Sequence, residues 1–194
     1  MNESIYYNVD GIHEAINHNK KISFQYAEWM ISKKERLKKD GALYRVSPWA
    51  LMWANENYYL VSYDSEKSMI KHFRVDKMRS IQVETEARDG SEKFEKFDMG
   101  DYAKQTFSMF GGTLERVKLV CDKKLIGVIM DRFGQDSMIM PQGDDHFSVV
   151  MDVEVSQQYL AWVIGLGAGA KVVSPENVVE QMRAEAKRLT EQYG

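Results

Sequence analysis

The chain has 194 residues, and 44% of them are hydrophobic, which is enough to build a packed core in one large domain or two small ones. Its 26 lysines and arginines nearly balance 29 aspartates and glutamates, leaving a formal net charge of -3. This balance excludes a global electrostatic attraction to nucleic acid or to an anionic membrane, so any binding of that kind must come from a local patch.

Cysteine usage indicates a reducing compartment. Cys121 is the only cysteine, which excludes an intramolecular disulfide and a zinc site of the multi-cysteine kind. It lies in a predicted strand, where a packed thiol is favoured over a nucleophile. The sequence begins without a signal pattern and has no apolar run near the ~20 residues that span a bilayer, so we expect a cytoplasmic protein that does not associate with membranes.

The first predicted element is a helix. Apolar residues recur at helical spacing over residues 9–19 after Asp10, which can serve as the N-cap. We therefore assign residues 1–19 to a leading helix. Residues 22–26 then alternate as a first strand, and residues 28–37 either continue that strand or pair with it.

A basic run follows and ends at Asp40-Gly41, a strong turn signal, so it is predicted to cap a hairpin. Two roles stay open for it: a solvated loop that keeps a sheet edge soluble, or a contact to phosphates. Its members are Lys33, Lys34, Arg36, Lys38 and Lys39.

The stretch from Leu43 to Val83 is predicted to be an antiparallel meander. Runs rich in aromatic and β-branched residues cover 43–46, 58–63, 70–75 and 78–83, and turn-forming clusters separate the first three.

Period-two alternation shows which side chains of this meander share a face. Phe73 and Val75 fall on one side of their strand, and His72, Arg74 and Asp76 fall on the other. One face is therefore expected to pack while the other is available for binding.

The second face combines basic and aromatic groups. Arg74 offers a planar fork suited to phosphate or carboxylate, and Tyr59 or Tyr63 could stack a base or sugar beside it. The alternative is a surface ion pair, for instance of Arg74 or Lys77 with Asp76 or Glu66. The spacing of these residues alone does not decide between ligand binding and a surface ion pair.

This meander resembles the WYL domain of bacterial transcriptional regulators. The residues that carry the resemblance are Tyr44-Arg45-Val46-Ser47-Pro48-Trp49, Tyr58-Tyr59-Leu60-Val61 and Phe73-Arg74-Val75-Asp76-Lys77-Met78. Tyr58 stands where the family's namesake tryptophan is usual, and Lys77 stands where arginine is usual. Both changes keep the chemical type.

The resemblance implies a small Sm-like or SH3-like β-barrel over residues 20–88 and a role in sensing effectors through a basic pocket. Some members of the family respond to single-stranded nucleic acid. The ligand-binding residues expected on this basis are Arg45, Ser47, Tyr59, Tyr63, His72, Arg74 and Lys77.

Residues 89–112 are predicted to be a connector. Acidic residues outnumber basic ones there, and irregularly spaced aromatics are expected to dock on neighbouring domains. The segment also resembles the family's connector, particularly in Phe97-Asp98, Tyr102 and the Ser108-Met109-Phe110-Gly111 run.

Residues 113–194 are predicted to form a second domain with the order βαββαβ and a final helix over 176–192. Its strands are expected at 115–122, 137–140, 146–155 and 170–173. This is the ferredoxin-like order, and the unit resembles the C-terminal extension that follows many WYL domains. The overall fold class is therefore predicted to be α+β.

Catalytic machinery is not visible in the sequence, so we expect neither an enzyme nor a cofactor. Gly165 to Gly169 follows a helix and precedes a strand, the reverse of a dinucleotide-binding loop. No metal cluster or nucleophile elbow can be read from the four histidines or the serines. The tryptophans Trp29, Trp49, Trp53 and Trp162 are each expected to be packing residues.

The sequence thus predicts the effector-binding, dimerising region of a transcriptional regulator, whose effector is an anion such as a nucleotide or single-stranded DNA or RNA. Nothing before Tyr26 is long enough for the helix-turn-helix that such regulators normally carry upstream, so promoter DNA would be bound only through a part outside this chain. The alternative is a free-standing WYL adaptor or RNA-binding accessory protein, for example in phage defence.

Overall fold

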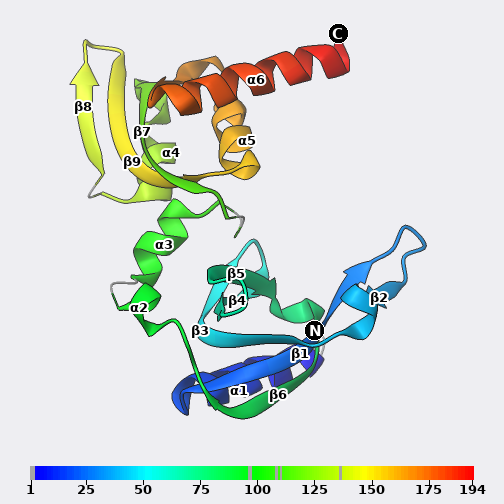
Figure 1. Cartoon of the computed structure of the whole chain (residues 1–194). Coiled ribbons are helices and arrows are strands. Elements are labelled where there is room, and N and C mark those ends of the chain that lie inside the picture. Colours follow the sequence, from blue (N-terminus) through cyan, green and yellow to red (C-terminus); the bar gives the residue numbers. More distant parts are fainter. Residues whose placement is uncertain (1–2, 96–97, 108, 110, 136) are drawn as a thin grey trace. The chain divides into compact units, whose positions relative to one another are not determined.

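The computed structural model describes residues 3–95, 98–107, 109, 111–135 and 137–194 (Figure 1). The chain divides into two compact units, Met1–Met99 and Gly100–Gly194. Each unit is described by itself below. Among the described residues, no helix combines the length and the apolar character needed to cross a bilayer.

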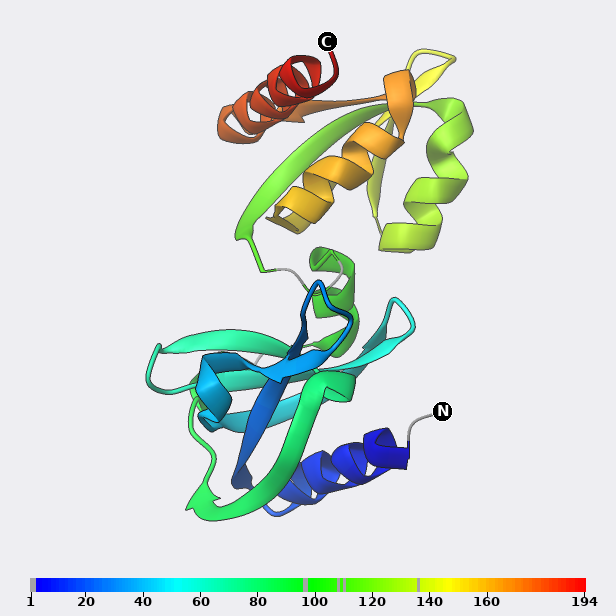
Figure 2. The ribbon, with the colours of Figure 1, turned by 90° about the vertical axis from the view of Figure 1, so that its right-hand side faces the viewer.

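The first unit is a curled antiparallel sheet with one helix packed on it (Figures 1 and 2). The strands pair in the order β2-β1-β3-β4-β5, and off this path β6 pairs with residues 20–26 of β1, before the stretch that pairs with β2. The sheet curls into a half-barrel. Its elements are α1 (Glu3–Asn17), β1 (Lys20–Trp29), β2 (Glu35–Leu37), η1 (Lys38–Gly41), β3 (Tyr44–Ala54), β4 (Asn57–Asp64), β5 (Met69–Arg74), η2 (Val75–Lys77) and β6 (Met78–Ala87).

The meander predicted from the alternation pattern is confirmed for β3, β4 and β5, whereas the last predicted run, β6, pairs with β1 and not with β5. Both predicted hairpin turns are present: Asn55 and Glu56 occupy the left-handed region between β3 and β4, and residues 65–68 turn between β4 and β5. Phe73 is buried in the core of this unit, as the pattern predicts.

The helix prediction was wrong at its start, because α1 begins at Glu3 and not at residue 9. The reason is a tertiary contact. Asn8 is buried, and its side-chain amide donates to the carbonyls of Val75 and Met78, 3.2 Å and 3.0 Å away. These bonds hold the early helical turns against η2, and local sequence does not reveal them.

The second unit is a four-stranded antiparallel sheet with strand order β10-β7-β9-β8. The predicted order βαββαβ is confirmed, followed by the predicted last helix. Its elements are α3 (Met99–Gln105), β7 (Thr113–Asp122), η3 (Lys123–Leu125), α4 (Ile126–Phe133), β8 (Met138–Gln142), β9 (His146–Val155), α5 (Gln157–Gly165), η4 (Gly167–Gly169), β10 (Ala170–Ser174) and α6 (Glu176–Tyr193).

Two local features of this unit stand out, and the second was predicted from the sequence. Ser156 caps α5, because its hydroxyl accepts from the backbone N–H of Tyr159 at 3.3 Å. Cys121 is a packed core residue, and burial raises the pKa of its thiol to about 11. A thiol with that pKa is almost wholly protonated at neutral pH and is therefore a poor nucleophile.

The connector contains two short helices, α2 (Ser91–Phe94) and α3. Its described aromatics pack as expected: Phe94 stacks on Trp49 with 4.8 Å between ring centroids, and Phe107 is buried in the core of the second unit. The residues Phe97, Ser108 and Phe110 of the predicted connector pattern lie outside the described residues.

Glu154 on β9 is an ionisable side chain in an unfavourable position. Its carboxylate accepts from the backbone N–H of Gly112, but Oε2 is buried without a hydrogen-bond partner among the described residues. Burial raises the pKa of this carboxyl. A carboxyl whose folded pKa is raised stabilises the fold below its unfolded pKa, and this contribution is lost as pH rises through the folded value.

We therefore expect Glu154→Gln to gain stability relative to the wild type at pH 7 and to lose that advantage as pH falls towards the unfolded pKa of glutamate, about 4.3. Urea unfolding of both proteins at several pH values measures the difference. Asp152→Asn, which changes an exposed carboxylate on the same strand, is the matched control. Parallel pH profiles for Glu154→Gln and the wild type would contradict the assignment.

Candidate functional site

The pairing of β4 with β5 decides which predicted ligand-binding residues share a face. Tyr59 lies opposite Arg74, Val61 opposite His72, and Tyr63 opposite Ile70. The next pair, Leu60 and Phe73, faces the core. Four of the seven predicted residues, namely Tyr59, Tyr63, His72 and Arg74, are therefore on one face of these two strands.

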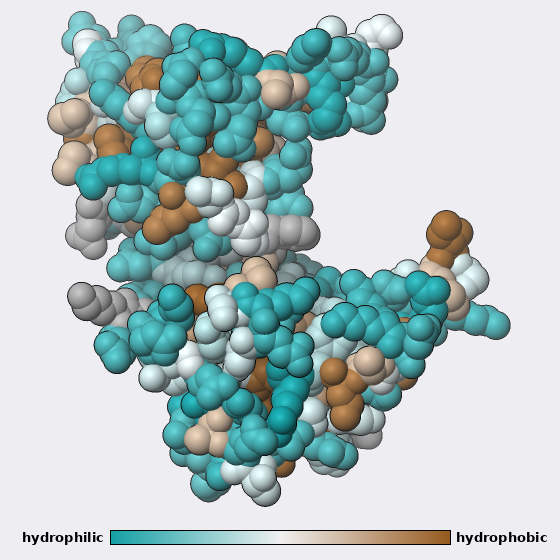
Figure 3. Space-filling view, viewed as in Figure 1, coloured by the Kyte–Doolittle hydropathy of each residue, from teal (hydrophilic) through white to brown (hydrophobic). Residues whose placement is uncertain are grey.

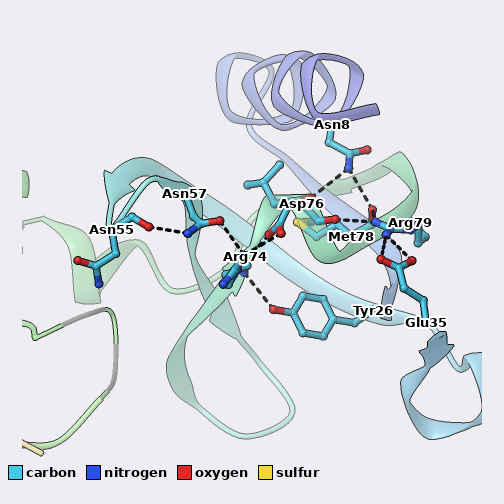
Figure 4. A network of polar contacts seen from close by, with 10 residues as sticks. Asn8, Tyr26, Glu35, Asn55, Asn57, Arg74, Asp76, Met78 and Arg79 are labelled. Carbon is cyan, nitrogen blue, oxygen red and sulfur yellow. Dashed lines mark hydrogen bonds and ion pairs between the residues drawn. The ribbon is translucent and has the colours of Figure 1, made fainter. Parts of the chain in front are cut away.

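Arg74 is held by two neighbours (Figure 4). Its Nε and Nη2 donate to Asp76 at 3.0 Å and 2.8 Å, and Nη2 also donates to Oδ1 of Asn57 at 2.7 Å. The hydrogen bonds to Asp76 are the main reason that the pKa of Arg74 is raised. The ion pair that the sequence left as an alternative is thus present. An anionic ligand would have to share the guanidinium of Arg74 with Asp76 or displace the Asp76 carboxylate from it.

The other end of the same face is covered by the start of the connector. Ser47 is fully buried, and its hydroxyl accepts from the backbone N–H of Asp89 at 2.8 Å. Gly90 lies directly against the ring of Tyr63. Trp49 is stacked between Phe94 and the guanidinium of Arg88, whose Cζ is 4.0 Å from the ring centroid. Neither Ser47 nor Tyr63 is open to a ligand while this segment is docked.

The two remaining predicted residues lie apart from this region. Arg45 on β3 forms ion pairs with Glu86 at 2.7 Å and Glu84 at 3.8 Å, both on β6. Lys77 follows Asp76 in η2 and is half-buried. The seven predicted residues therefore do not converge on one point, and Tyr59, His72 and Arg74 are the ones that stay half-buried together on one face.

A group that sequence reasoning missed lies next to Arg74. Tyr26 and Tyr44 are half-buried at the edge of an aromatic cluster with Phe24 and Phe73, in which every ring pair has centroids between 5.0 and 6.3 Å apart. The hydroxyl of Tyr26 accepts from the backbone N–H of Arg74 at 3.1 Å (Figure 4). Burial raises the pKa of this phenol, so it stays neutral at physiological pH.

Two lysines of the basic run stand over these tyrosines. The Nζ of Lys39 is 4.6 Å from the ring centroid of Tyr44, and that of Lys38 is 6.0 Å from the ring of Tyr26. Both distances fall in the range of cation–π attraction. We call the set Tyr26, Lys38, Lys39, Tyr44 and Arg74 the tyrosine–lysine site.

The backbone of η1 puts these lysines in place. Lys39 and Asp40 have φ values of 51° and 52°, in the left-handed region that side-chain-bearing residues rarely adopt. The turn is anchored because Gln25 donates to the carbonyl of Gly41 at 2.7 Å. The lysine run, its Asp40-Gly41 turn signal and the alternation of residues 22–26 were signals for this site, but the sequence did not show that the left-handed turn between β2 and β3 places the lysines over Tyr26 and Tyr44.

The described residues contain no group of three or more histidine, cysteine, aspartate or glutamate side chains placed to hold a metal ion. The arrangement suits non-covalent binding: two aromatic rings with cations above them, and a guanidinium beside them. Stacked bases and phosphates are the ligands that this combination accommodates best.

Comparison with known proteins agrees with the resemblance seen in the sequence. A model of the WYL domain matches residues 7–83, and a model of the WCX domain matches residues 113–190. No curated protein matches significantly. The chain is similar to the solved structure of Proteasome accessory factor B/C (PafBC) of Arthrobacter aurescens, with 17% sequence identity and a TM-score of 0.40. The match covers 100% of this chain and 28% of that one. Because the two domain models cover the first and the second unit in turn, the chain belongs to the WYL-domain proteins and carries a WCX domain after its WYL domain.

Proposed function

We propose that this chain is the ligand-sensing region of a bacterial transcriptional regulator and that its effector is an anion, either a nucleotide or a short single strand of nucleic acid. The proposal combines the WYL and WCX matches with the chemistry of the tyrosine–lysine site. The effector would bind at that site and not across all seven residues predicted from the sequence.

The observation that carries the proposal is the placement of Lys38 and Lys39 over Tyr26 and Tyr44. Phe24 is stacked on Tyr44, so a base that stacks on the Tyr44 ring would displace the ammonium of Lys39, which could then meet the phosphate of the same nucleotide. Stacking of this kind is worth about 1–3 kcal/mol per base and tolerates any base. Such a site recognises nucleotides as a class and does not select one nucleotide sequence.

Arg74 would supply the third contact. Its ion pair with Asp76 is partly exposed on both sides, and exposed pairs contribute only about 0–1 kcal/mol. A phosphate can replace a carboxylate on the guanidinium with hydrogen bonds of equal or greater strength. Exchange of Asp76 for a phosphate is therefore feasible without unfolding.

The remaining expectations belong to this proposal. The curled sheet is assigned as an Sm-like barrel, and the second unit as ferredoxin-like, because the strand order β10-β7-β9-β8 combined with βαββαβ connections is that of the split βαβ arrangement. The chain would form a homodimer. Effector binding would then change the arrangement of attached DNA-binding heads, provided that the effector prefers one arrangement.

The test measures binding of fluorescein-labelled oligothymidylate by anisotropy across a salt series. Lys39→Glu and Arg74→Glu should each weaken binding by about tenfold or more and reduce the salt dependence. Tyr44→Leu should weaken binding, whereas Tyr44→Phe should retain it. Lys67→Glu, an exposed lysine in the β4–β5 turn, is the matched control and should bind like the wild type. Equal binding by Lys39→Glu, Arg74→Glu and the wild type, all verified as folded, would rule out this site.

A second function, a free-standing adaptor, is favoured by the tip of the β1–β2 hairpin. Trp29 is 63% exposed and Ile31 is fully exposed, which makes the packing expectation for Trp29 wrong. Figure 3 shows hydrophobic side chains standing at this tip. Exposed apolar groups next to lysines suit a contact with another macromolecule. A helix-turn-helix encoded in frame upstream of Met1 would support the regulator, and a start codon with its ribosome site would support the adaptor.

A further inference from the structure

The first unit has a pocket that is lined in part by Asp76, the ion-pair partner of Arg74. It is about 370 Å³ in volume and lies between the first turns of α1 and the β3–β4 hairpin. This volume is within the range of small-molecule sites, roughly 300–1,000 Å³. Ile5 and Val9 of α1 supply apolar surface, and Trp53, Tyr58, Glu56 and Asp76 are part of the lining.

The aromatic part of this pocket is unusual because its rings are largely exposed. Trp53 and Tyr58 are cross-strand partners, 63% and 41% exposed, and their rings meet edge to face with centroids 4.8 Å apart. The packing expectation for Trp53 was therefore wrong. A tryptophan face is the strongest aromatic attractor of cations.

The charged groups of the pocket are acidic. No lysine, arginine or histidine is among the described lining residues. Asp76 is already paired with Arg74, but no ion pair to Glu56 occurs among the described residues. The lining thus carries one carboxylate without an ion pair among the described residues, beside the aromatic rings of Tyr6, Trp53 and Tyr58 and an apolar wall.

We propose that this pocket binds a small organic monocation, such as an aromatic amine or a quaternary ammonium. The hydrocarbon part would lie against Ile5 and Val9, and the charged nitrogen would lie between the Trp53 face and the carboxylates. Neither the WYL and WCX matches nor the proposed anion site assigns a ligand to this place.

The two sites share no residue, but two residues of the pocket hydrogen-bond to Arg74 of the tyrosine–lysine site, which couples them. Asp76 and Asn57 line the pocket, and the same two residues hold the guanidinium of Arg74 (Figure 4). A cation in the pocket draws part of the charge of Asp76 away from Arg74. The guanidinium then interacts more strongly with an anion at the tyrosine–lysine site, so the two ligands favour each other. This second step rests on the proposed function.

The backbone around Asp76 is fixed by hydrogen bonds, so a ligand in the pocket is expected to shift side chains and not the main chain. Asn8 donates to the carbonyls on both sides of Asp76, and Nη1 of Arg79 donates to the carbonyl of Asp76 itself at 2.7 Å. Arg79 is in turn held by Glu35 through two hydrogen bonds of 2.8 Å and 2.6 Å. The main chain of η2 is therefore fixed between α1 and β2.

The first experiment titrates the full chain with benzyltrimethylammonium, benzyl alcohol and phenylacetate by ligand-observed NMR. Only the cation should show saturable binding, with a dissociation constant of about 1 mM or below. Trp53→Leu should weaken it by about tenfold and Glu56→Gln by about threefold. Trp29→Leu, equally exposed at 63%, and Glu66→Gln in the next turn are matched controls. Equal binding of all three probes, or unchanged binding by Trp53→Leu, would overturn the pocket assignment.

The second experiment measures oligothymidylate binding with benzyltrimethylammonium chloride or with sodium chloride at the same ionic strength. The organic cation should raise the affinity at least about threefold, and Asp76→Asn should give a similar rise without it. No rise would refute the coupling while leaving the pocket intact. Because cation binding is measured without any anion, the pocket and the proposed function can fail independently.

Discussion

Phe24→Ala is expected to destabilise the first unit by about 3–5 kcal/mol, the range for removal of a fully buried phenylalanine. Phe24 is completely inaccessible to solvent, and its ring contacts those of Tyr26, Tyr44 and Phe73. Deleting the ring leaves a cavity at the centre of the cluster. Urea unfolding measures the loss of stability. Amide hydrogen exchange on β1 and β3 shows whether that loss is in the first unit.

Leu43→Ala is the control for this substitution because Leu43 is an exposed apolar residue of the same sheet region, and its loss should cost less than about 0.5 kcal/mol. Phe24→Leu should be intermediate. If Phe24→Ala and Leu43→Ala unfold at the same urea concentration, the aromatic cluster is not the core of this unit.

Gly90→Ala is expected to cost about 2–5 kcal/mol, the sum of backbone strain and overpacking. Gly90 has φ of +83°, and a Cβ built on it would lie 2.5 Å from two ring carbons of Tyr63. Alanine must therefore displace either the ring or the segment that begins the connector. Urea unfolding gives the cost, and faster amide exchange near residues 88–95 would show that the segment has undocked.

Gly143→Ala separates the cost of backbone strain from the cost of overpacking. Gly143 also has a positive φ, of +68°, but no atom lies within 4 Å of the position of its Cβ. It should therefore show only the backbone cost of about 1–2 kcal/mol. Equal losses for the two variants would mean that Gly90 does not pack against Tyr63.

Prediction from sequence succeeded where local pattern and packing agree. Period-two alternation placed Phe73 in the core and Arg74 on the other face, and turn residues marked both hairpins of the meander. The spacing of Arg74 and Asp76 also revealed their possible ion pair. Each of these features depends on residues close together in the chain.

Features that depend on contacts between residues far apart in the chain could not be predicted from the sequence. The early turns of α1 are held by Asn8 bonding to residues 67 and 70 positions away. Ser47 was predicted as a ligand contact, but the connector covers it from 42 positions away. The exposure of Trp53 could not be inferred either, since tryptophan is usually packed and nothing local indicates the pocket beside it.

Lys39 illustrates a conflict between folding and recognition. Its left-handed backbone would suit glycine better, and glycine there would relieve strain of about 1 kcal/mol or more. Glycine would also remove the ammonium over Tyr44. On the proposed function, selection for thermal robustness and selection for effector affinity therefore act in opposite directions on this one codon, and variants stabilised there should be poorer sensors.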